Sequence, residues 1–200
     1  MAWDERHEQD PDLNLGPVVT FLNNALAMKM KGDRVHYRHL VHQLVHRDDA
    51  ETLWRLYLGL SRTVSIICEH PEEFGELIDA IFRYDWTGHE TVTSSFVKLV
   101  SHLVTANSTY LVPAMHNLVR NVLVRPNESD PNSEGYQRRC TRQTQVHHTL
   151  QTVITLVPSG CGKLFPVLRT HYPHKSQAAD VLSNYAEQLL EVTEYIPVVR

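Results

Sequence analysis

The sequence predicts an all-α protein, a HEAT-like α-α superhelix of antiparallel helix pairs that is truncated at the C-terminus. Three observations support this fold class. Apolar residues recur at helical spacing in several segments. Short polar turns separate these segments into pairs, and the pairs follow one another at intervals of about 40 to 50 residues, which is typical of HEAT repeats. In such an array each pair buries its apolar stripe against its neighbours.

The clearest pair runs from Ser95 to Val124. The apolar residues of its first helix are Phe96, Leu99, Val100, Leu103 and Val104, which share one helical face. A turn is predicted over Ala106–Thr109, because Asn, Ser and Thr favour turns and caps. In the second helix the stripe consists of Leu111, Met115, Leu118, Val119, Val122 and Leu123. Pro113 lies near the start of that helix, where a missing N–H is tolerated.

The same order recurs downstream. Leu150–Val157 forms a helix, Pro158–Gly162 a turn, and Lys163–Leu168 a second helix that contains Pro166. A weaker upstream copy consists of one helix over Leu53–Ile67 and another over Phe74–Phe82. The last copy begins at Ala178, and the chain ends where its second helix would start.

The rest of the chain adds two helices and two polar segments. Helices are predicted over Pro17–Met30 and Val35–His46, and Asp48 or Asp49 is suited to cap the helix that follows. We expect residues 1–16 to be a disordered tail, residues 17–200 to form the helical-repeat domain, and residues 126–142 to be a mobile polar insertion.

Composition excludes several functional classes. The net charge of −4 argues against direct, sequence-specific nucleic-acid binding. The three cysteines form neither a disulfide framework nor a C-x-x-C pair, which favours a reducing compartment. The acidic first residues resemble no signal or transit peptide, and no apolar run is long enough to span a membrane.

No residue set indicates catalysis, so we expect no enzyme activity, metal or cofactor. His39, His42 and His46 share a helical face and could bind a metal, but no carboxylate or cysteine completes a shell and a solvated face is favoured. Ser159–Lys163 lacks the first glycine and the final Ser or Thr of a phosphate-binding loop. Cys68 lies in an apolar run and is interpreted as a packing residue.

The serines are the candidate regulatory residues. Ser61 and Ser65 are spaced i, i+4 on one predicted helix. Ser129 and Ser133 lie in the acidic half of the polar insertion. A phosphate on any of them would add about −1.5 to −2 charges and would change the attraction for a charged partner.

Segments spread in order over most of the chain share a further pattern. They are Lys29–Asp33, Leu40, Leu44, Trp54–Leu56, Phe74–Ile78, Ile81–Trp86, Phe96–Pro113, His147–Gln151, Val157–Pro158, Leu164–Leu168, Tyr172–Lys175 and Tyr195–Pro197. Through these residues the chain resembles the RNA polymerase I-specific transcription initiation factor family over about residues 18–200.

The resemblance implies a non-enzymatic HEAT-repeat adaptor of the nucleus and nucleolus. Such a factor binds RNA polymerase I subunits and links them to promoter-bound initiation factors for ribosomal RNA synthesis. It also implies that Ser65, together with Ser61, lies on the polymerase-binding face, where phosphorylation blocks docking. The family's acidic, serine-rich insertion corresponds to residues 126–142, which are short here and contain three arginines. Family members also continue for several further repeats.

Two other functions remain as alternatives. One is a generic helical-repeat scaffold for protein assembly or trafficking. The other is a metal-dependent helical-bundle enzyme, which depends on the three histidines of residues 39–46.

Overall fold

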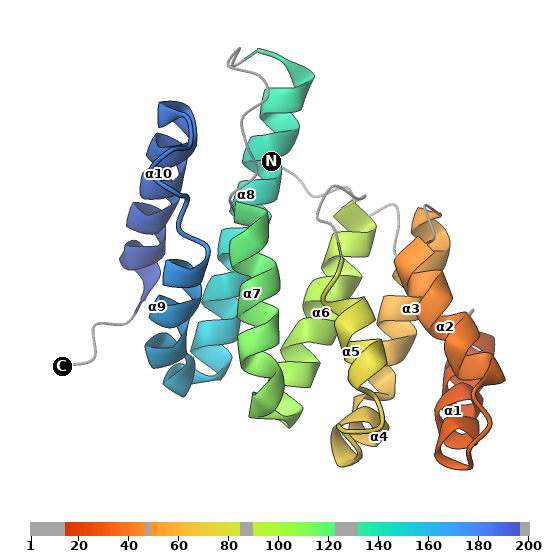
Figure 1. Cartoon of the computed structure of the whole chain (residues 1–200). Coiled ribbons are helices and arrows are strands. Elements are labelled where there is room, and N and C mark those ends of the chain that lie inside the picture. The colour runs from red at the N-terminus through yellow and green to blue at the C-terminus, as the bar shows by residue number, and fades with distance from the viewer. Residues whose placement is uncertain (1–14, 47–48, 85–89, 123–131, 197–200) are drawn as a thin grey trace, which may run out of the picture. The chain divides into compact units, whose positions relative to one another are not determined.

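The computed structural model describes residues 15–46, 49–84, 90–122 and 132–196. Within these ranges the chain forms α-helices and short 3-10 turns and contains no β-strand (Figure 1). The predicted all-α fold is therefore confirmed. None of the described helices is long and apolar enough to cross a membrane. The chain divides into two compact units, one of Met1–Ile81 with His89–Leu99 and one of Phe82–Gly88 with Val100–Arg200.

Unit 1 contains α1 to α5 and the first part of α6. The bounds are α1 (Gly16–Met30), α2 (Val35–His46), α3 (Ala50–Arg62), α4 (Val64–Glu69), α5 (Gly75–Ile81) and α6 (Glu90–Ala106). Local signals set the boundaries of the first three. Gly32 follows the end of α1 and has a φ of +92°, a backbone conformation that favours glycine. Asp33 accepts a hydrogen bond from Val35 N at the start of α2. Asp49, one of the two residues predicted to cap α3, accepts hydrogen bonds from the backbone N–H groups of Glu51 and Thr52.

The core of unit 1 is built where α1 packs against α2 and α3 and where α2 packs against α5. Its fully buried large side chains include Leu22, Leu26, Tyr37, Leu40, Tyr57, Leu60, Ile67, Phe74 and Phe96. Leu15 is also buried and α1 begins at Gly16, so the last two residues of the predicted tail belong to the fold. Residues 1–14 lie outside the described part of the chain.

Unit 2 contains the end of α6, the second helix of the first predicted pair and the whole of the next pair. The bounds are η2 (Ser108–Tyr110), α7 (Leu111–Val122), α8 (Glu134–Leu156), η3 (Pro158–Gly160), α9 (Cys161–Thr170) and α10 (Ala179–Tyr195). Asn107 accepts a hydrogen bond from Thr109 N and so caps the turn that leads into α7. Both predicted helix–turn–helix segments are present, and α7 lies against α8 and α9 (Figure 1).

The glycine-rich segment between α8 and α9 is a tight turn, as predicted. Gly160 is buried, and a Cβ there would lie 2.9 Å from Met115 Cε and 3.2 Å from a Leu111 methyl carbon. The residue therefore lets the η3 turn approach α7 closely. This close approach explains the glycine without any phosphate-binding role.

Two sequence predictions were wrong. The helix expected over Leu53–Ile67 is broken at Thr63 into α3 and α4. The polar insertion expected over 126–142 is helical from Glu134. Ser133 caps this helix by accepting a hydrogen bond from Tyr136 N, and Glu134 forms an ion pair with Arg138, one turn later in the helix. Residues 126–131 of that insertion lie outside the described ranges.

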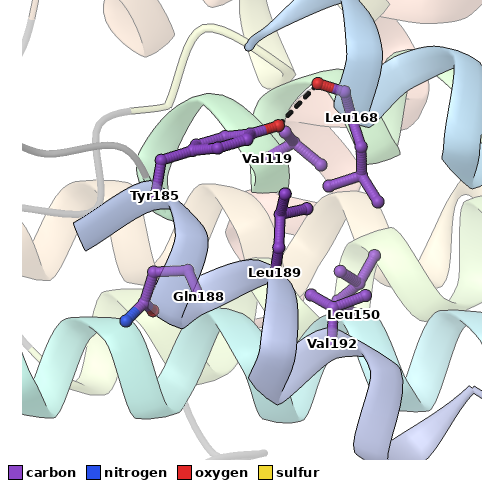
Figure 2. Close-up of a pocket in the computed structure, with 7 residues that line it drawn as sticks. All are labelled: Val119, Leu150, Leu168, Tyr185, Gln188, Leu189 and Val192. Carbon is purple, nitrogen blue, oxygen red and sulfur yellow. Dashed lines mark hydrogen bonds between the residues drawn. The ribbon is translucent and has the colours of Figure 1, made fainter. Parts of the chain in front are cut away.

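Figure 2 shows a small apolar cavity among α7, α8, α9 and α10. Its volume is about 10 Å³, which is at the lower limit for one water molecule. The residues that line it are Val119, Leu150, Leu168, Tyr185, Gln188, Leu189 and Val192. The Tyr185 hydroxyl donates to the Leu168 carbonyl at 2.5 Å, which ties α10 to α9 beside the cavity (Figure 2). The cavity is thus a packing gap rather than a ligand site.

Candidate interaction surface

The structure separates the two serines that the sequence placed together. Ser65 lies on α4 and is exposed, whereas Ser61 lies on α3 and is only 6% exposed. The Ser61 hydroxyl donates a hydrogen bond to the Leu58 carbonyl at 2.7 Å. The prediction that both serines share one helix was therefore wrong, and only Ser65 is accessible to a partner or a kinase.

The break at Thr63 has a local physical cause. The Thr63 hydroxyl donates to the Leu60 carbonyl at 3.1 Å, and the Thr63 N–H bonds to the same carbonyl. Hydroxyl groups that bond back to the preceding turn compete with the regular helix ladder. Val64 follows directly, and two consecutive β-branched residues further lower helix propensity. The chain changes direction here, and Ser65 is turned outward.

The side chains around Ser65 give the α4 surface a mixed charge. Arg62 and Glu69 are both exposed, three residues before and four residues after Ser65. A phosphate on Ser65 would add negative charge beside Glu69, which opposes docking of an acidic partner. Cys68 is half-buried on the same helix, and burial raises the pKa of its thiol. A thiol held in its protonated form is a poor nucleophile, in keeping with a packing role.

A polar cluster fixes the segment between α4 and α5. Lys29 of α1 is largely buried, and its Nζ lies 2.8 Å from Glu73 Oε2 and 5.2 Å from the centre of the Tyr37 ring. The hydrogen bond and charge of Lys29 hold the pKa of Glu73 below its usual value. These contacts link α1 and α2 to the segment that follows α4.

Tyr37 completes this cluster from α2. Its hydroxyl accepts a hydrogen bond from the Leu77 backbone N–H at 3.1 Å, in the first turn of α5. That N–H has no partner within its own helix, so the tyrosine satisfies it. Burial raises the pKa of Tyr37 to about 12, so the phenol stays protonated at neutral pH.

Of the two other candidate serines, the structure describes only Ser133. Ser133 is half-buried and serves as the cap of α8, where its Oγ accepts from Tyr136 N at 3.1 Å. Its hydroxyl thus has a structural role, which phosphorylation would alter. Ser129 lies outside the described residues.

The histidines of α2 do not assemble a metal shell. His39, His42 and His46 are exposed, and the rings of His42 and His46 lie 4.5 Å apart. His39 Nε2 instead lies 2.7 Å from the Gln43 side-chain nitrogen. Among the described residues, no group of three or more His, Cys, Asp or Glu side chains is placed to hold a metal ion.

Sequence reasoning missed the buried polar residues of unit 2. Asn117 is buried on α7 outside the predicted apolar stripe, and its amide donates to the carbonyls of Phe82 and Tyr84. His147 of α8 is buried, with Nδ1 2.9 Å from the Tyr195 hydroxyl and Nε2 2.8 Å from Gln188 Oε1. A polar residue at an apolar position of the helical repeat could have identified His147, which precedes the buried Leu150 and Ile154 by three and seven residues. Asn117 gives no such signal, because it lies off the stripe.

Comparison with known proteins identifies the family. The family described as "RNA polymerase I specific transcription initiation factor RRN3" matches residues 12–200. The chain is 23% identical to the RNA polymerase I-specific transcription initiation factor rrn3 of Schizosaccharomyces pombe over 184 residues, which is 90% of this chain and 29% of that protein. It is 27% identical to the RRN3 factor of Mus musculus over 138 residues, which is 64% of this chain and 21% of the mouse protein.

A solved structure shows the same fold. The crystal structure of RNA polymerase I transcription initiation factor Rrn3 superposes with a TM-score of 0.71 at 18% identity, covering 88% of this chain and 35% of the solved chain. The chain therefore spans less than a third of each curated relative described above. On the match over residues 12–200, this chain belongs to the RNA polymerase I-specific transcription initiation factor RRN3 family.

Proposed function

We propose that this chain acts in transcription initiation by RNA polymerase I as a non-enzymatic adaptor. It binds the polymerase and links it to promoter-bound factors for ribosomal RNA synthesis, in the nucleus and nucleolus. The observation that carries the proposal is the family match over residues 12–200. The names of the matched relatives describe initiation factors specific to RNA polymerase I.

We propose that the α4 surface around Ser65 contacts the polymerase. Two observations support this placement. Ser65 is exposed on a helix whose neighbouring segment is fixed by the cluster of Lys29, Glu73 and Tyr37. Ser61 is buried and bonded to the Leu58 carbonyl, so it supports the helix end instead of contacting a partner.

A pull-down with purified RNA polymerase I tests the proposal. The unphosphorylated chain should retain the polymerase, and Ser65→Asp should weaken retention because it places a negative charge on the contact surface. Ser94→Asp is the matched control, since Ser94 is also exposed in unit 1 but lies on α6. Equal loss in both variants would place the contact elsewhere.

Two further results would count against the adaptor function. Failure of the unphosphorylated chain to retain any polymerase would leave the general scaffold function as the better explanation. A distribution of the tagged chain outside the nucleus would point the same way. A nucleolar signal that coincides with polymerase I would support the proposal.

A further inference from the structure

Two histidines join α7 to the end of α9. His116 Nδ1 lies 2.9 Å from His171 Nε2, and the ring centres are 5.1 Å apart. Both side chains are half-buried and belong to unit 2, in which α7 and α9 pack side by side. His171 directly follows α9, and its backbone N–H donates to the Val167 and Leu168 carbonyls. The imidazole contact therefore holds the C-terminal end of α9 against α7.

The number of protons on the two rings decides whether this hydrogen bond can form. A neutral imidazole has one N–H donor and one acceptor nitrogen, whereas an imidazolium has two donors. At 2.9 Å one of the facing nitrogens donates and the other accepts. This arrangement is possible when both rings are neutral and when only the donor ring is charged. When both rings are charged, each facing nitrogen carries a hydrogen and the hydrogen bond is lost.

The surroundings of the pair oppose a second positive charge. Burial, His116 and Arg120, in that order, lower the pKa of His171. Helices α7 and α9 contain no Asp or Glu, and neither does the rest of the chain from residue 135 to residue 179. No carboxylate on these two helices therefore compensates for the charge of a doubly protonated pair.

The other elements around the pair supply no counter-charge to His171. Helix α8 and the η2 turn pack against α7, and α10 is tied to α9 by the Tyr185–Leu168 hydrogen bond. Two basic groups adjoin His171 along the chain, Arg169 and His174, and both are exposed. The acidic residues of α8 and α10 are Glu134, Asp180, Glu187, Glu191 and Glu194. None of these carboxylates is among the groups that shift the pKa of His171.

We infer that the His116–His171 pair is a pH-sensitive contact, which holds the end of α9 on α7 while no more than one ring is protonated and opens when both are. His171 is the first residue of the segment that connects α9 to α10. The next residue, Tyr172, contacts Tyr185 of α10 edge to face, with ring centres 5.3 Å apart. Opening of the pair should therefore loosen the connection between α9 and α10. The inference does not depend on the polymerase proposal, which concerns α4 of unit 1.

The direction of the pKa shift sets the pH range of this effect. An unfolded histidine has a pKa of about 6.5, and the folded-state pKa of His171 lies below its usual value. The stabilisation by the pair is therefore present above about pH 6.5 and is lost as the pH falls through the folded-state pKa, because the unfolded chain binds the proton first. For one proton, the equilibrium constant of unfolding rises by at most about tenfold at about pH 5.5.

Urea unfolding of the full chain, followed by circular dichroism at about pH 5.5 and about pH 7.5, tests the inference. The test variant is His116→Asn/His171→Gln, whose side-chain amides can form one hydrogen bond with each other but bind no proton. Between the two pH values, the equilibrium constant of unfolding should rise about threefold to tenfold more in the wild type than in this variant.

The matched control removes a second pair of histidines. It is His42→Asn/His46→Gln, on α2, where the two rings lie 4.5 Å apart but are exposed. Solvent and salt screen charges at exposed positions, so this control should follow the pH dependence of the wild type within about twofold.

Hydrogen exchange measured by mass spectrometry locates the effect. After correction for the intrinsic pH dependence of exchange, the wild-type chain should lose protection over residues 167–172 at about pH 5.5, and the test variant should not. Helix α2 of unit 1 should keep its protection in both chains, because it lies outside the unit that contains the pair.

Three results would overturn the inference. They are the same pH dependence of unfolding in the wild type and the test variant, an equal change in the control variant, and unchanged protection of residues 167–172 in acid. If the test variant does not fold, His171→Gln alone takes its place. It leaves only one ring that can be charged, so it should show the same weaker dependence on pH.

Discussion

Asn117 offers the sharpest test of how unit 2 is held together. This residue is 3% exposed, and its side-chain amide donates to the Phe82 carbonyl at 2.8 Å and to the Tyr84 carbonyl at 3.1 Å. Asn117→Asp keeps the shape of the side chain but removes both N–H donors. The variant places carboxylate oxygens against two carbonyl oxygens in a buried site.

The size of the effect follows from these two contacts. Each lost hydrogen bond contributes about 1 kcal/mol, and burying a carboxylate against carbonyl oxygens adds a cost of desolvation and repulsion. We expect Asn117→Asp to lower the free energy of unfolding by at least about 3 kcal/mol at neutral pH. For a chain of this length such a change lowers Tm by about 6–12 °C.

The effect should depend on pH with a defined sign. Burial and the two carbonyl oxygens both disfavour the charged form, so the folded-state pKa of the introduced carboxyl rises above its unfolded value of about 3.9. Below that unfolded value both states are protonated, and the neutral carboxyl can donate one hydrogen bond. As the pH rises from there, the unfolded state releases its proton first and the variant loses stability.

Urea unfolding followed by circular dichroism at several pH values measures how the free energy of unfolding of Asn117→Asp depends on pH. Asn24→Asp is the control, because Asn24 is exposed on α1 and the variant has the same change of charge. The stability difference between the two variants should grow from acid to neutral pH. A difference that is the same at every pH, or no difference at neutral pH, would refute the role assigned to the Asn117 amide.

Three further predictions concern unit 1. Glu73→Gln should destabilise the chain at neutral pH, because Lys29 loses its anionic partner. Because the folded-state pKa of Glu73 is lowered, the ion pair stabilises the fold above the unfolded glutamate pKa of about 4.3. This stabilisation is lost as the pH falls. Urea unfolding should therefore give the same free energy of unfolding for wild type and variant in acid. Gly59→Val should lower the free energy of unfolding by about 1–3 kcal/mol, since a Cβ there lies 2.7 Å from Leu22 Cδ1. Gly75→Ala, with open space at its Cβ, should be neutral or slightly stabilising in thermal melts.

The positions of most helices could be predicted from sequence because their signals are local. The 3.6-residue apolar period placed α2 from Val35 to His46, as the structure has it. The turn around Asn107 was also predictable, since an asparagine cap acts within two residues of itself. The α3–α4 break at Thr63 was missed, because the apolar stripe continues across it while hydroxyl bonds to the preceding carbonyls interrupt the ladder.

The candidate sites were less predictable than the helices. Spacing alone put Ser61 and Ser65 on one face, but the break between α3 and α4 buries the first and exposes the second. The contact between His116 and His171 joins residues 55 positions apart, and no periodic pattern encodes such a distance.

By itself, the sequence determined that this protein is all-α, where its helix pairs lie, and which family it resembles, because periodicity, capping and turn chemistry act over a few residues. Only the tertiary structure decided which polar groups are buried and which of them meet. Lys29 meets Glu73, and Asn117 meets Phe82, across 44 and 35 residues of chain. Such pairings depend on how helices pack, and packing is set by the sum of many long-range contacts rather than by any one segment.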